Sequence, residues 1–436
     1  MSDWGLVDTV EPNLLRDLFP YERVPSVRFE ASDAPFSPAP EMWITDTTFR
    51  DGQQAREPYT VEQIVRLFDL LRALDNGVGL IRQSEFFLYT EKDRAAVGAV
   101  QERGYEFPEV TSWIRAVKTD FQLVKAAGVK ETGILTSCSD YHIFSKLGWT
   151  RAEALHNYLD IVDGALEAGI KPRCHFEDLT RADVAGFALP FARALMERAR
   201  QSGVSIKIRL CDTMGVGLPW PAAALPRGIH KLVRAFVEEA GVPPAQLEWH
   251  GHNDLFKVHA NSVSAWLYGC SAINATLLST GERTGNSPLE AAVVEYAGLT
   301  GETRIDLRVL TEIAKYMGET CGVPAPPSYP LLGSEFNVTR AGIHADGLLK
   351  DEEIYNVFDT KALLGRPVGV SVNDKSGAAG VAFWVGQQLE TKVDKGDPGV
   401  QAMYLEIQEL YQRGRSSGLT QDELLGLARN HLPDRF

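Results

Sequence analysis

Eight short apolar segments alternate with longer helical patterns along the middle of this chain. The segments are MWIT, VGLIRQ, EVTSWI, ETGILT, IKPRCHF, SIKIRLC, LEWHGH and SAINATL. The stretches between them, such as VEQIVRLFDLLRAL and ALHNYLDIVDGALEAG, place apolar residues three or four positions apart, which is the spacing of an amphipathic helix. Eight strand–helix repeats over about 260 residues are what a closed (β/α)8 barrel requires. We therefore predict an α/β fold of the TIM-barrel type.

An open, doubly wound sheet is the alternative fold, but no GxGxxG follows the first strand, which disfavours its dinucleotide-binding version. Residues 1–40 end in the proline-rich stretch SDAPFSPAPE and are expected to form an extended arm. The barrel is expected over residues 41–320. The segment GVPAPP then reads as a linker, and a loop-rich block followed by helical patterns predicts a linker and helical lid over residues 321–436.

Composition narrows the class of protein. The formal charge is −14, from 44 basic and 58 acidic residues, and long basic runs are missing, so we expect no nucleic-acid partner. No apolar stretch approaches the roughly 20 residues of a membrane span, so we expect no membrane partner. The 5 cysteines form no CxxC pair, and the first residues do not read as a signal peptide. These features predict a cytoplasmic protein.

The first predicted strand runs into TDTTFRDGQQ, where Arg50 and Asp51 stand side by side before Gly52. In a TIM barrel, functional side chains lie at the carboxyl ends of the strands. Arg50 and Asp51 should therefore face the mouth of the barrel. Gly52 lets the backbone turn without a side chain blocking that mouth.

Two further motifs follow the seventh and eighth predicted strands. In WHGHND, His250 and His252 are two residues apart on a strand, so both imidazoles point to one side and could hold a divalent metal with a carboxylate. A structural role is an equal alternative for such a pair taken alone. GERTGNSP alone reads better as a loop that enters a helix. Because strand ends one, seven and eight are adjacent in a closed barrel, we expect all three motifs to meet.

DTTFRDGQQ, HGHND and GERTGN, in this order, resemble the 2-isopropylmalate synthase and homocitrate synthase family of metallolyase-type barrels, which condense acetyl-CoA with a 2-oxo acid. The resemblance implies that Asp51, His250 and His252 bind a divalent metal, with Asn286 as a weaker fourth ligand. Manganese is expected, with zinc, magnesium or cobalt as alternatives. Arg50 would polarise the substrate oxo group. The implied coenzyme A contacts are Gly281, Glu282, Arg283 and Gly285.

Other family elements extend this assignment. Thr213 in CDTMG matches a threonine that holds the substrate carboxylate, and Glu177 matches a glutamate of the site. The segment AGIHADG with the later Tyr355 resembles a lid that reaches into the partner subunit's site. The resemblance therefore implies that His344 and Tyr355 serve in acid–base catalysis, and that the protein is a homodimer with lid exchange.

The substrate is predicted to be a 2-oxo dicarboxylic acid. Arg173 matches the position where homocitrate synthases hold the distal carboxylate, although a neighbour such as Glu177 could pair it instead, since a buried unpaired arginine is costly. Arg82 adds a second possible anion contact. Arg82 aligns directly with a site glutamate of the family, and Glu85 aligns only with a shift, so the occupant of that position stays open.

Wider stretches, including IRQSEFFLYT and TGILTSCSDYHIF, are most similar to the Re-type citrate synthases of this family. The resemblance predicts an acyltransferase that condenses acetyl-CoA with oxaloacetate, hydrolyses the thioester and releases citrate and CoA. Homocitrate synthase and 2-isopropylmalate synthase are the alternatives within the family. A hydroxyacyl-CoA lyase and a non-catalytic metal-binding scaffold are the alternatives outside it. Ser279 replaces a glycine of the family's loop, and His142 receives no role.

Overall fold

The computed structural model describes residues 5–16, 35–356 and 358–436, so residues 1–4 and 17–34 of the predicted arm lie outside the described residues. The chain divides into two compact units, Met1–Ile305 and Asp306–Phe436. The division falls before the predicted linker, so helix α10 (Arg308–Glu319) belongs to the second unit.

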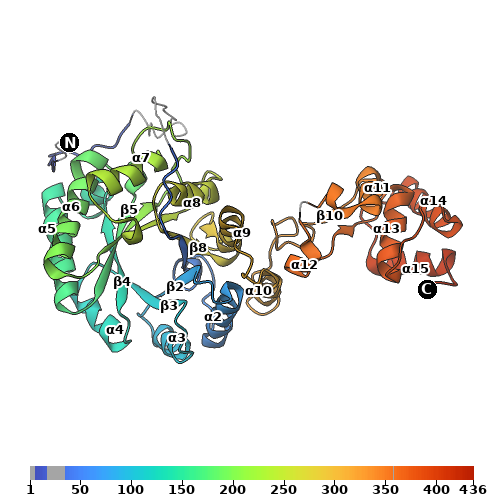
Figure 1. Cartoon of the computed structure of the whole chain (residues 1–436), viewed down its shortest axis with the longest axis horizontal. Coiled ribbons are helices and arrows are strands. Elements are labelled where there is room, and N and C mark those ends of the chain that lie inside the picture. The colour runs from blue at the N-terminus through green and yellow to red at the C-terminus, as the bar shows by residue number, and fades with distance from the viewer. Residues whose placement is uncertain (1–4, 17–34, 357) are drawn as a thin grey trace. The chain divides into compact units, whose positions relative to one another are not determined.

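The first unit is a closed barrel, which confirms the predicted TIM-barrel fold (Figure 1). Each strand pairs in parallel with the next, and the first pairs with the eighth. A two-residue strand, β9 (Ser287–Pro288), extends the sheet beside β8. The eight strands are β1 (Trp43–Asp46), β2 (Ile81–Phe86), β3 (Glu109–Ile114), β4 (Glu131–Ser137), β5 (Lys171–Glu177), β6 (Lys207–Asp212), β7 (Leu247–Gly251) and β8 (Ala272–Thr276).

Helices surround the barrel, and their starts follow from local sequence. Thr60, Thr90 and Thr150 each accept a hydrogen bond from the third helical residue in a capping box, which begins α2, α3 and α5. The helices are α1 (Asp51–Gln54), α2 (Val61–Asp75), α3 (Glu91–Gln101), α4 (Phe121–Ala126), α5 (Arg151–Glu167), α6 (Leu189–Ser202), α7 (Ile229–Arg234), α8 (Val258–Leu267) and α9 (Leu289–Thr300). Short 3-10 or π segments are η1 (Lys118–Asp120), η2 (Tyr141–Lys146), η3 (Leu179–Arg181), η4 (Val184–Ala188), η5 (Ala235–Glu239), η6 (Pro244–Gln246) and η7 (Leu277–Ser279).

Strand β5 shows how the two faces of the barrel wall differ. Phe176 stacks on Phe191 of α6 with ring centroids 4.8 Å apart, so this side chain packs against the helices. Its neighbours in the alternation, Arg173, His175 and Glu177, face the barrel interior, because side chains alternate along a strand. Arg173 is fully buried there, as is Arg209 on β6. The interior of this barrel therefore carries charge at its centre.

The second unit contains the loop-rich block and the helices that the sequence predicts. Its apolar core includes Val381, Val385, Val400, Met403 and Ile407. In addition to α10, the elements of the second unit are β10 (Val338–Thr339), α11 (Gly342–Lys350), η8 (Glu352–Ile354), α12 (Thr360–Leu364), β11 (Gly369–Val370), α13 (Gly377–Leu389), α14 (Pro398–Gln412) and α15 (Gln421–His431). Strands β10 and β11 pair in parallel.

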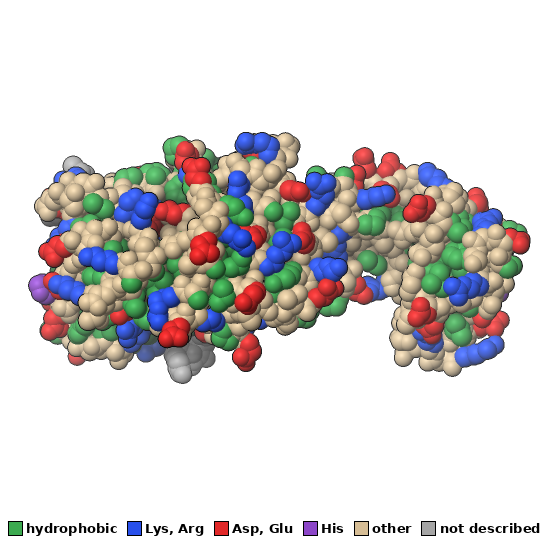
Figure 2. All heavy atoms as spheres, turned by 90° about the horizontal axis from the view of Figure 1, so that it is seen from below, with side chains coloured by type: hydrophobic (Ala, Val, Ile, Leu, Met, Phe, Trp, Pro, Cys, Tyr) green, Lys and Arg blue, Asp and Glu red, His purple; other side chains and the backbone are tan. Residues whose placement is uncertain are grey.

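The described surface agrees with the chain's composition. On the face shown in Figure 2, acidic and basic side chains are interspersed rather than gathered by sign. Among the described residues, no helix is both long enough and apolar enough to cross a membrane.

Candidate metal centre and active site

A pocket of about 370 Å³ lies at the carboxyl ends of the barrel strands. This is the end at which TIM barrels carry their active sites. All thirteen lining residues come from the carboxyl-terminal parts of barrel strands or from the segments that follow them. They are Arg50, Asp51 and Gln54 after β1, Trp113 on β3, Leu135 on β4, His175 and Glu177 on β5, Cys211 and Thr213 at the end of β6, His250 and His252 at the end of β7, and Glu282 and Arg283 after β8.

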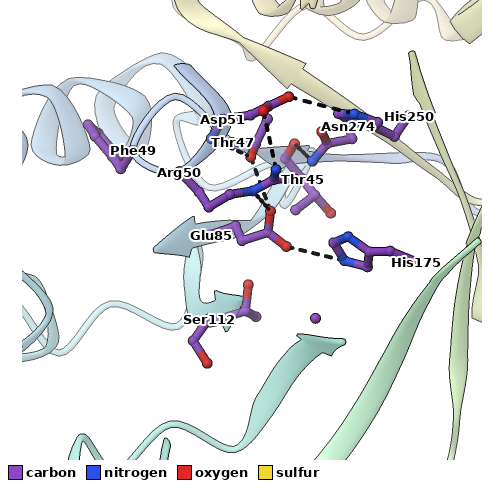
Figure 3. A network of polar contacts seen from close by, with 12 residues as sticks. Thr45, Thr47, Phe49, Arg50, Asp51, Glu85, Ser112, His175, His250 and Asn274 are labelled. Carbon is purple, nitrogen blue, oxygen red and sulfur yellow. Dashed lines mark hydrogen bonds and ion pairs between the residues drawn. The ribbon is translucent and has the colours of Figure 1, made fainter. Parts of the chain in front are cut away.

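Three residues in this pocket, which we call the metal triad, are Asp51, His250 and His252. One ligand atom from each lies within 4.8 Å of the others, and all three residues are buried. Nε2 of His250 is 3.6 Å and Nε2 of His252 is 3.7 Å from Asp51 Oδ2. Asp51 and His250 face each other in Figure 3. The structure thus brings together the first and seventh strand ends.

The groups around the metal triad orient its ligand atoms. Asn274 Oδ1 lies 2.6 Å from Nδ1 of His250, and an amide oxygen can only accept, so this nitrogen carries the proton. Nε2 of His250 then presents a lone pair toward Asp51. Asn286 donates a hydrogen bond from Nδ2 to Asp51 Oδ2 over 2.8 Å. Among the described residues, Asn286 Oδ1 and His252 Nδ1 are buried without a hydrogen-bond partner.

The protonation states also suit a metal. Burial alone would raise the pKa of Asp51, but the Arg50 guanidinium and the two imidazoles outweigh it and lower that pKa to about 2. Burial lowers the pKa of His250 to about 3 and that of His252 below its usual value. An ionised carboxylate and two neutral imidazoles are ligands that divalent first-row metals accept. The residues therefore fit a divalent metal.

Arg50 lies beside the metal triad. Its Nε donates to Glu85 Oε2 over 2.7 Å, and its NH1 is 3.2 Å from Asp51 Oδ1. Glu85 therefore takes the strand-two position in the site that the sequence left open. Arg82 lies near the amino end of β2, where it pairs with Glu41 and lies over the Trp43 ring. Because side chains alternate along a strand, Arg82 points to the opposite face of β2 from Glu85. Its position therefore gives no support to the predicted contact with an anionic substrate.

Beneath the pocket lies a group of charged residues that we call the ion-pair layer, Glu85, Arg173, Arg209 and Glu248. Arg173 donates from NH2 to Glu85 Oε1 over 2.6 Å and from NH1 to Glu131 over 3.0 Å. Arg209 donates to Glu85 and to Glu248, each over 3.0 Å. Together, three arginines lower the pKa of Glu85 far below its usual value despite burial.

The ion-pair layer bears on the predicted role of Arg173. The sequence left two partners for Arg173, the substrate or a neighbour, and in this structure neighbours occupy it. The expected neighbour, Glu177, is not among its partners. Four residues along a strand span about 13 Å, too far for a direct ion pair. Glu85 and Glu131, from other strands, take that place.

Glu177 lines the pocket above Arg173 and has its own partners. Nδ1 of His142 is 2.9 Å from Oε2, Lys146 Nζ is 3.3 Å away, and Ser137 also donates to this carboxylate. Although burial opposes ionisation, these contacts lower the pKa of Glu177 to about 2. His142 thus contacts a residue of the pocket, and sequence reasoning gave it no role. It stands on the π-helical segment η2, and nothing in the local sequence reveals that this turn reaches Glu177.

Loops close the rim of the pocket. Thr213 Oγ1 accepts a hydrogen bond from the backbone N–H of Asp178, so its hydroxyl proton remains for another acceptor. Arg283 forms a forked ion pair with Asp254. A Cβ on Gly281 would lie 1.8 Å from Asn286 Oδ1, and one on Gly285 would lie 1.9 Å from Ser279 O, so both glycines are needed for the loop to fold back on itself.

His344 and Tyr355 are close together in the second unit. Their ring centroids are 4.3 Å apart, and Nδ1 of His344 lies 3.0 Å from the Thr339 hydroxyl. Tyr355 is 47 % exposed, and Ile343, which precedes His344 in the chain, is 74 % exposed. The structure places these residues relative to each other, and their predicted contribution to a catalytic site stays a prediction.

Comparison with known proteins gives consistent matches. The HMGL-like family model matches residues 41–317. The chain is 53% identical to Citrate (Re)-synthase of Syntrophus aciditrophicus, over 99% of this chain and 69% of that protein. It is 50% identical to Citrate (Re)-synthase of Clostridium kluyveri, over 99% of this chain and 96% of that protein. Hydroxymethylglutaryl-CoA lyase of Pseudomonas aeruginosa shares the fold with a TM-score of 0.52 and 17% identity, over 66% of this chain and 95% of that one.

Proposed function

Because the chain belongs to the HMGL-like family, we propose that it is an acyltransferase that condenses acetyl-CoA with oxaloacetate, hydrolyses the resulting thioester with water and releases citrate and CoA. The names of the two relatives that are half identical over nearly the whole chain support this reaction. The observation that carries the proposal is the buried metal triad with Arg50 beside it, at the carboxyl ends of the barrel strands.

Asp51, His250 and His252 would hold a divalent metal. Asn286 would serve as a further ligand after rotation of its amide, because Nδ2 faces Asp51 here and Oδ1 lies beside Gly281. We propose manganese, with zinc, magnesium and cobalt as alternatives that the same donors accept. Such a metal, when bound, polarises the substrate oxo group as a Lewis acid. Arg50, held by Glu85 and Asp51, adds positive charge where an alkoxide develops, which is typically worth about 10²–10³ in rate.

Other pocket residues would position the substrates. The free hydroxyl proton of Thr213 suits the carboxylate next to the oxo group. Glu282 and Arg283 stand at the rim, between Gly281 and Gly285, where acetyl-CoA would approach. Glu177 is already ionised and strongly paired, so with a pKa of about 2 it is a weak base near neutral pH. We therefore assign Glu177 an assisting role and leave proton abstraction to another group.

His344 with Tyr355 would supply that base. Histidine suits proton transfer near neutral pH, and the ring is oriented by Thr339 and Tyr355. We propose a homodimer in which this segment enters the site of a second copy. The exposed side chains of Ile343, Ile354 and Tyr355 support that contact, because exposed apolar clusters mark interaction surfaces. We also propose a cytoplasmic location, as the composition suggests.

The test is thiol release from acetyl-CoA by purified, manganese-loaded protein with oxaloacetate, 2-oxoglutarate, 2-oxoisovalerate or pyruvate. We expect selective turnover of oxaloacetate, with citrate as the product. Turnover of 2-oxoglutarate instead would assign homocitrate synthesis, and turnover of 2-oxoisovalerate would assign 2-isopropylmalate synthesis. Silence with all four would reject the proposal and favour a hydroxyacyl-CoA lyase or a binding role. H431Q, in α15 of the second unit, serves as a control for substitution of a histidine outside the pocket.

A further inference from the structure

Oxaloacetate has a second carboxylate, and the engagement of Arg173 leaves that group without an obvious partner. Both terminal nitrogens of Arg173 already donate to protein oxygens, and the residue is fully buried. Its Nε makes no hydrogen bond to a described residue, but it lies in the barrel interior 3.6 Å from Glu248 Oε2. Pulling Arg173 away would leave Glu85 and Glu131 short of a partner, which is strongly unfavourable in a barrel interior. A group that lines the pocket and has hydrogen-bonding capacity to spare is a better candidate.

His175 meets both conditions. It lies on β5 between Arg173 and Glu177, on the same strand face, and its ring lines the pocket. The residue is only 3 % exposed, yet the described part of the chain makes no hydrogen bond to its imidazole, and Nε2 is buried without a partner. Glu85 lies close to the ring, with Oε1 3.6 Å from Nε2 (Figure 3). Glu85 is already bonded to Arg50, Arg173 and Arg209.

The neighbouring strand makes room for this ring. Gly133 lies on β4, and a Cβ there would stand 2.5 Å from Nε2 and 2.9 Å from Cε1 of His175. Its φ is not positive, so the backbone would accept another residue and only the imidazole requires glycine here. A buried polar ring that needs a glycine beside it, and then makes no hydrogen bond, is costly unless a ligand completes it.

The surrounding charges favour an anion at this place. Burial and the positive charges of Arg209, Arg173 and Arg50 outweigh the nearby Glu85 carboxylate and hold the pKa of His175 far below its usual value. The ring is therefore neutral and carries one N–H donor. Nε2 faces Glu85, so the nitrogen left for a ligand is Nδ1, for which the described residues supply no partner. With the proton on Nδ1, a substrate carboxylate would gain that donor and the positive potential of the arginines, without displacing any ion pair of the protein.

We infer that His175 is the specificity-determining residue of the pocket, and that its imidazole donates a hydrogen bond to the distal carboxylate of the 2-oxo dicarboxylic acid. This inference rests on the proposed function for the identity of that acid. Arg173 acts from beneath as part of the ion-pair layer. A 2-oxo acid without a distal carboxylate would leave His175 unpartnered and would bind less tightly.

The experiment measures the dissociation constants of oxaloacetate and pyruvate by calorimetry with manganese-loaded protein. In H175L we expect oxaloacetate to bind about 10- to 100-fold more weakly, the range for one hydrogen bond to a charged group. Pyruvate binding should change less than about threefold, because pyruvate has no distal carboxylate. H175Q retains a donor and should recover part of the loss. G133A keeps the imidazole but displaces it, and should weaken oxaloacetate binding selectively.

Equal weakening of both ligands in H175L, no change in either, or absence of oxaloacetate binding to the unaltered protein would overturn the inference. The control H259Q alters a histidine of α8 beside Glu295, outside the pocket, and should bind both ligands normally. Thiol release, measured in parallel, reports separately on the proposed function. Protein that binds oxaloacetate through His175 but releases no thiol would refute the reaction and leave the contact standing.

Discussion

The metal triad and the ion-pair layer are neighbouring sets of buried ionisable residues that differ in how their polar atoms are paired. In the ion-pair layer, each guanidinium donates at least two hydrogen bonds to carboxylates. Around the metal triad, Asn286 Oδ1 and His252 Nδ1 are buried without a partner. The ion-pair layer is not fully satisfied either, because Nε of Arg173 and Nε of Arg209 are also buried without a hydrogen-bond partner among the described residues.

The two sets differ in the distances between their ionisable groups. The imidazoles of the metal triad stand 3.6 and 3.7 Å from Asp51 Oδ2, beyond hydrogen-bond distance. Glu85 and Glu248, in contrast, each lie within 3.0 Å of an arginine nitrogen.

The two sets are joined through one residue. Arg50 contacts Asp51 of the metal triad and Glu85 of the ion-pair layer. Glu85 in turn holds Arg173 and Arg209. The ion-pair layer can thus fix Arg50 beside the metal triad, because Glu85 Oε2 accepts a hydrogen bond from Arg50 Nε over 2.7 Å. Substitutions in the first set should mainly remove activity, and substitutions in the second should mainly remove stability.

The largest expected effect is loss of turnover when the metal triad is broken. D51N should lower kcat/KM for oxaloacetate by at least about 10³-fold, because it removes an anionic ligand and the partner of Arg50. Chelation of metal from the unaltered protein should have the same effect, and added manganese should reverse it. Thiol release and metal content by mass spectrometry check both. Full activity of D51N with normal metal content would contradict this assignment.

The next effect is loss of stability when the ion-pair layer is broken. E85Q leaves Arg173 and Arg209 short of a carboxylate in the barrel interior, so we expect the barrel to lose about 3–5 kcal/mol of stability. Thermal melting followed by circular dichroism checks this. D254N breaks the partly exposed pair with Arg283 and should cost no more than about 1 kcal/mol. Equal melting temperatures for the two variants would show that the ion-pair layer does not stabilise the barrel.

The barrel and the meeting of three motifs could be predicted from sequence because both follow from local patterns. Strand periodicity fixes which residues end each strand, and barrel closure places ends one, seven and eight together. Arg82 lies elsewhere on its strand than expected, and the cause is also local. The expected strand VGLIRQ ends at Gln83, whereas β2 runs from Ile81 to Phe86. That shift moves Arg82 from the mouth to the amino end of the strand.

Contacts across the barrel interior could not be predicted in the same way. Arg173 meets Glu85 of β2 and Glu131 of β4 because of the relative register of these strands, which no single segment encodes. The contact between His142 and Glu177 depends on the path of the loop after β4. The alternation of residues along a strand predicts which face of the sheet each side chain lies on. The level along the barrel axis at which residues of different strands meet depends on the register of the closed sheet.

Glu177 tests whether a mouth carboxylate can also stabilise the fold. Its folded-state pKa of about 2 is lower than the value of 4.5 for a free side chain, so its contribution is present above about pH 4.5 and is lost as the pH falls toward 2. E177Q should cost at most about 3 kcal/mol at pH 6. Its deficit in melting temperature should shrink between pH 4.5 and 3. A deficit that stays constant over this range would mean that the contacts with His142 and Lys146 do not depend on the charge of Glu177.

The smallest expected effect concerns the loop after β8, at the mouth of the barrel. The backbone is strained in this loop, whereas it is not strained in the strands that carry the ion-pair layer. Leu278, Ser279 and Arg283 have φ values of 52°, 54° and 53°, in the left-handed region. S279G should relieve about 1–2 kcal/mol of that strain and lose the bond from Ser279 Oγ to Asn286 O, worth about 1 kcal/mol. The melting temperature should therefore change by only a few degrees, and kcat/KM by less than about threefold. G298A, at an open position of α9, provides a stabilising reference of about 1 kcal/mol in the same assay. A large loss of activity in S279G would mean that the hydroxyl of Ser279 holds Asn286 in place at the metal triad.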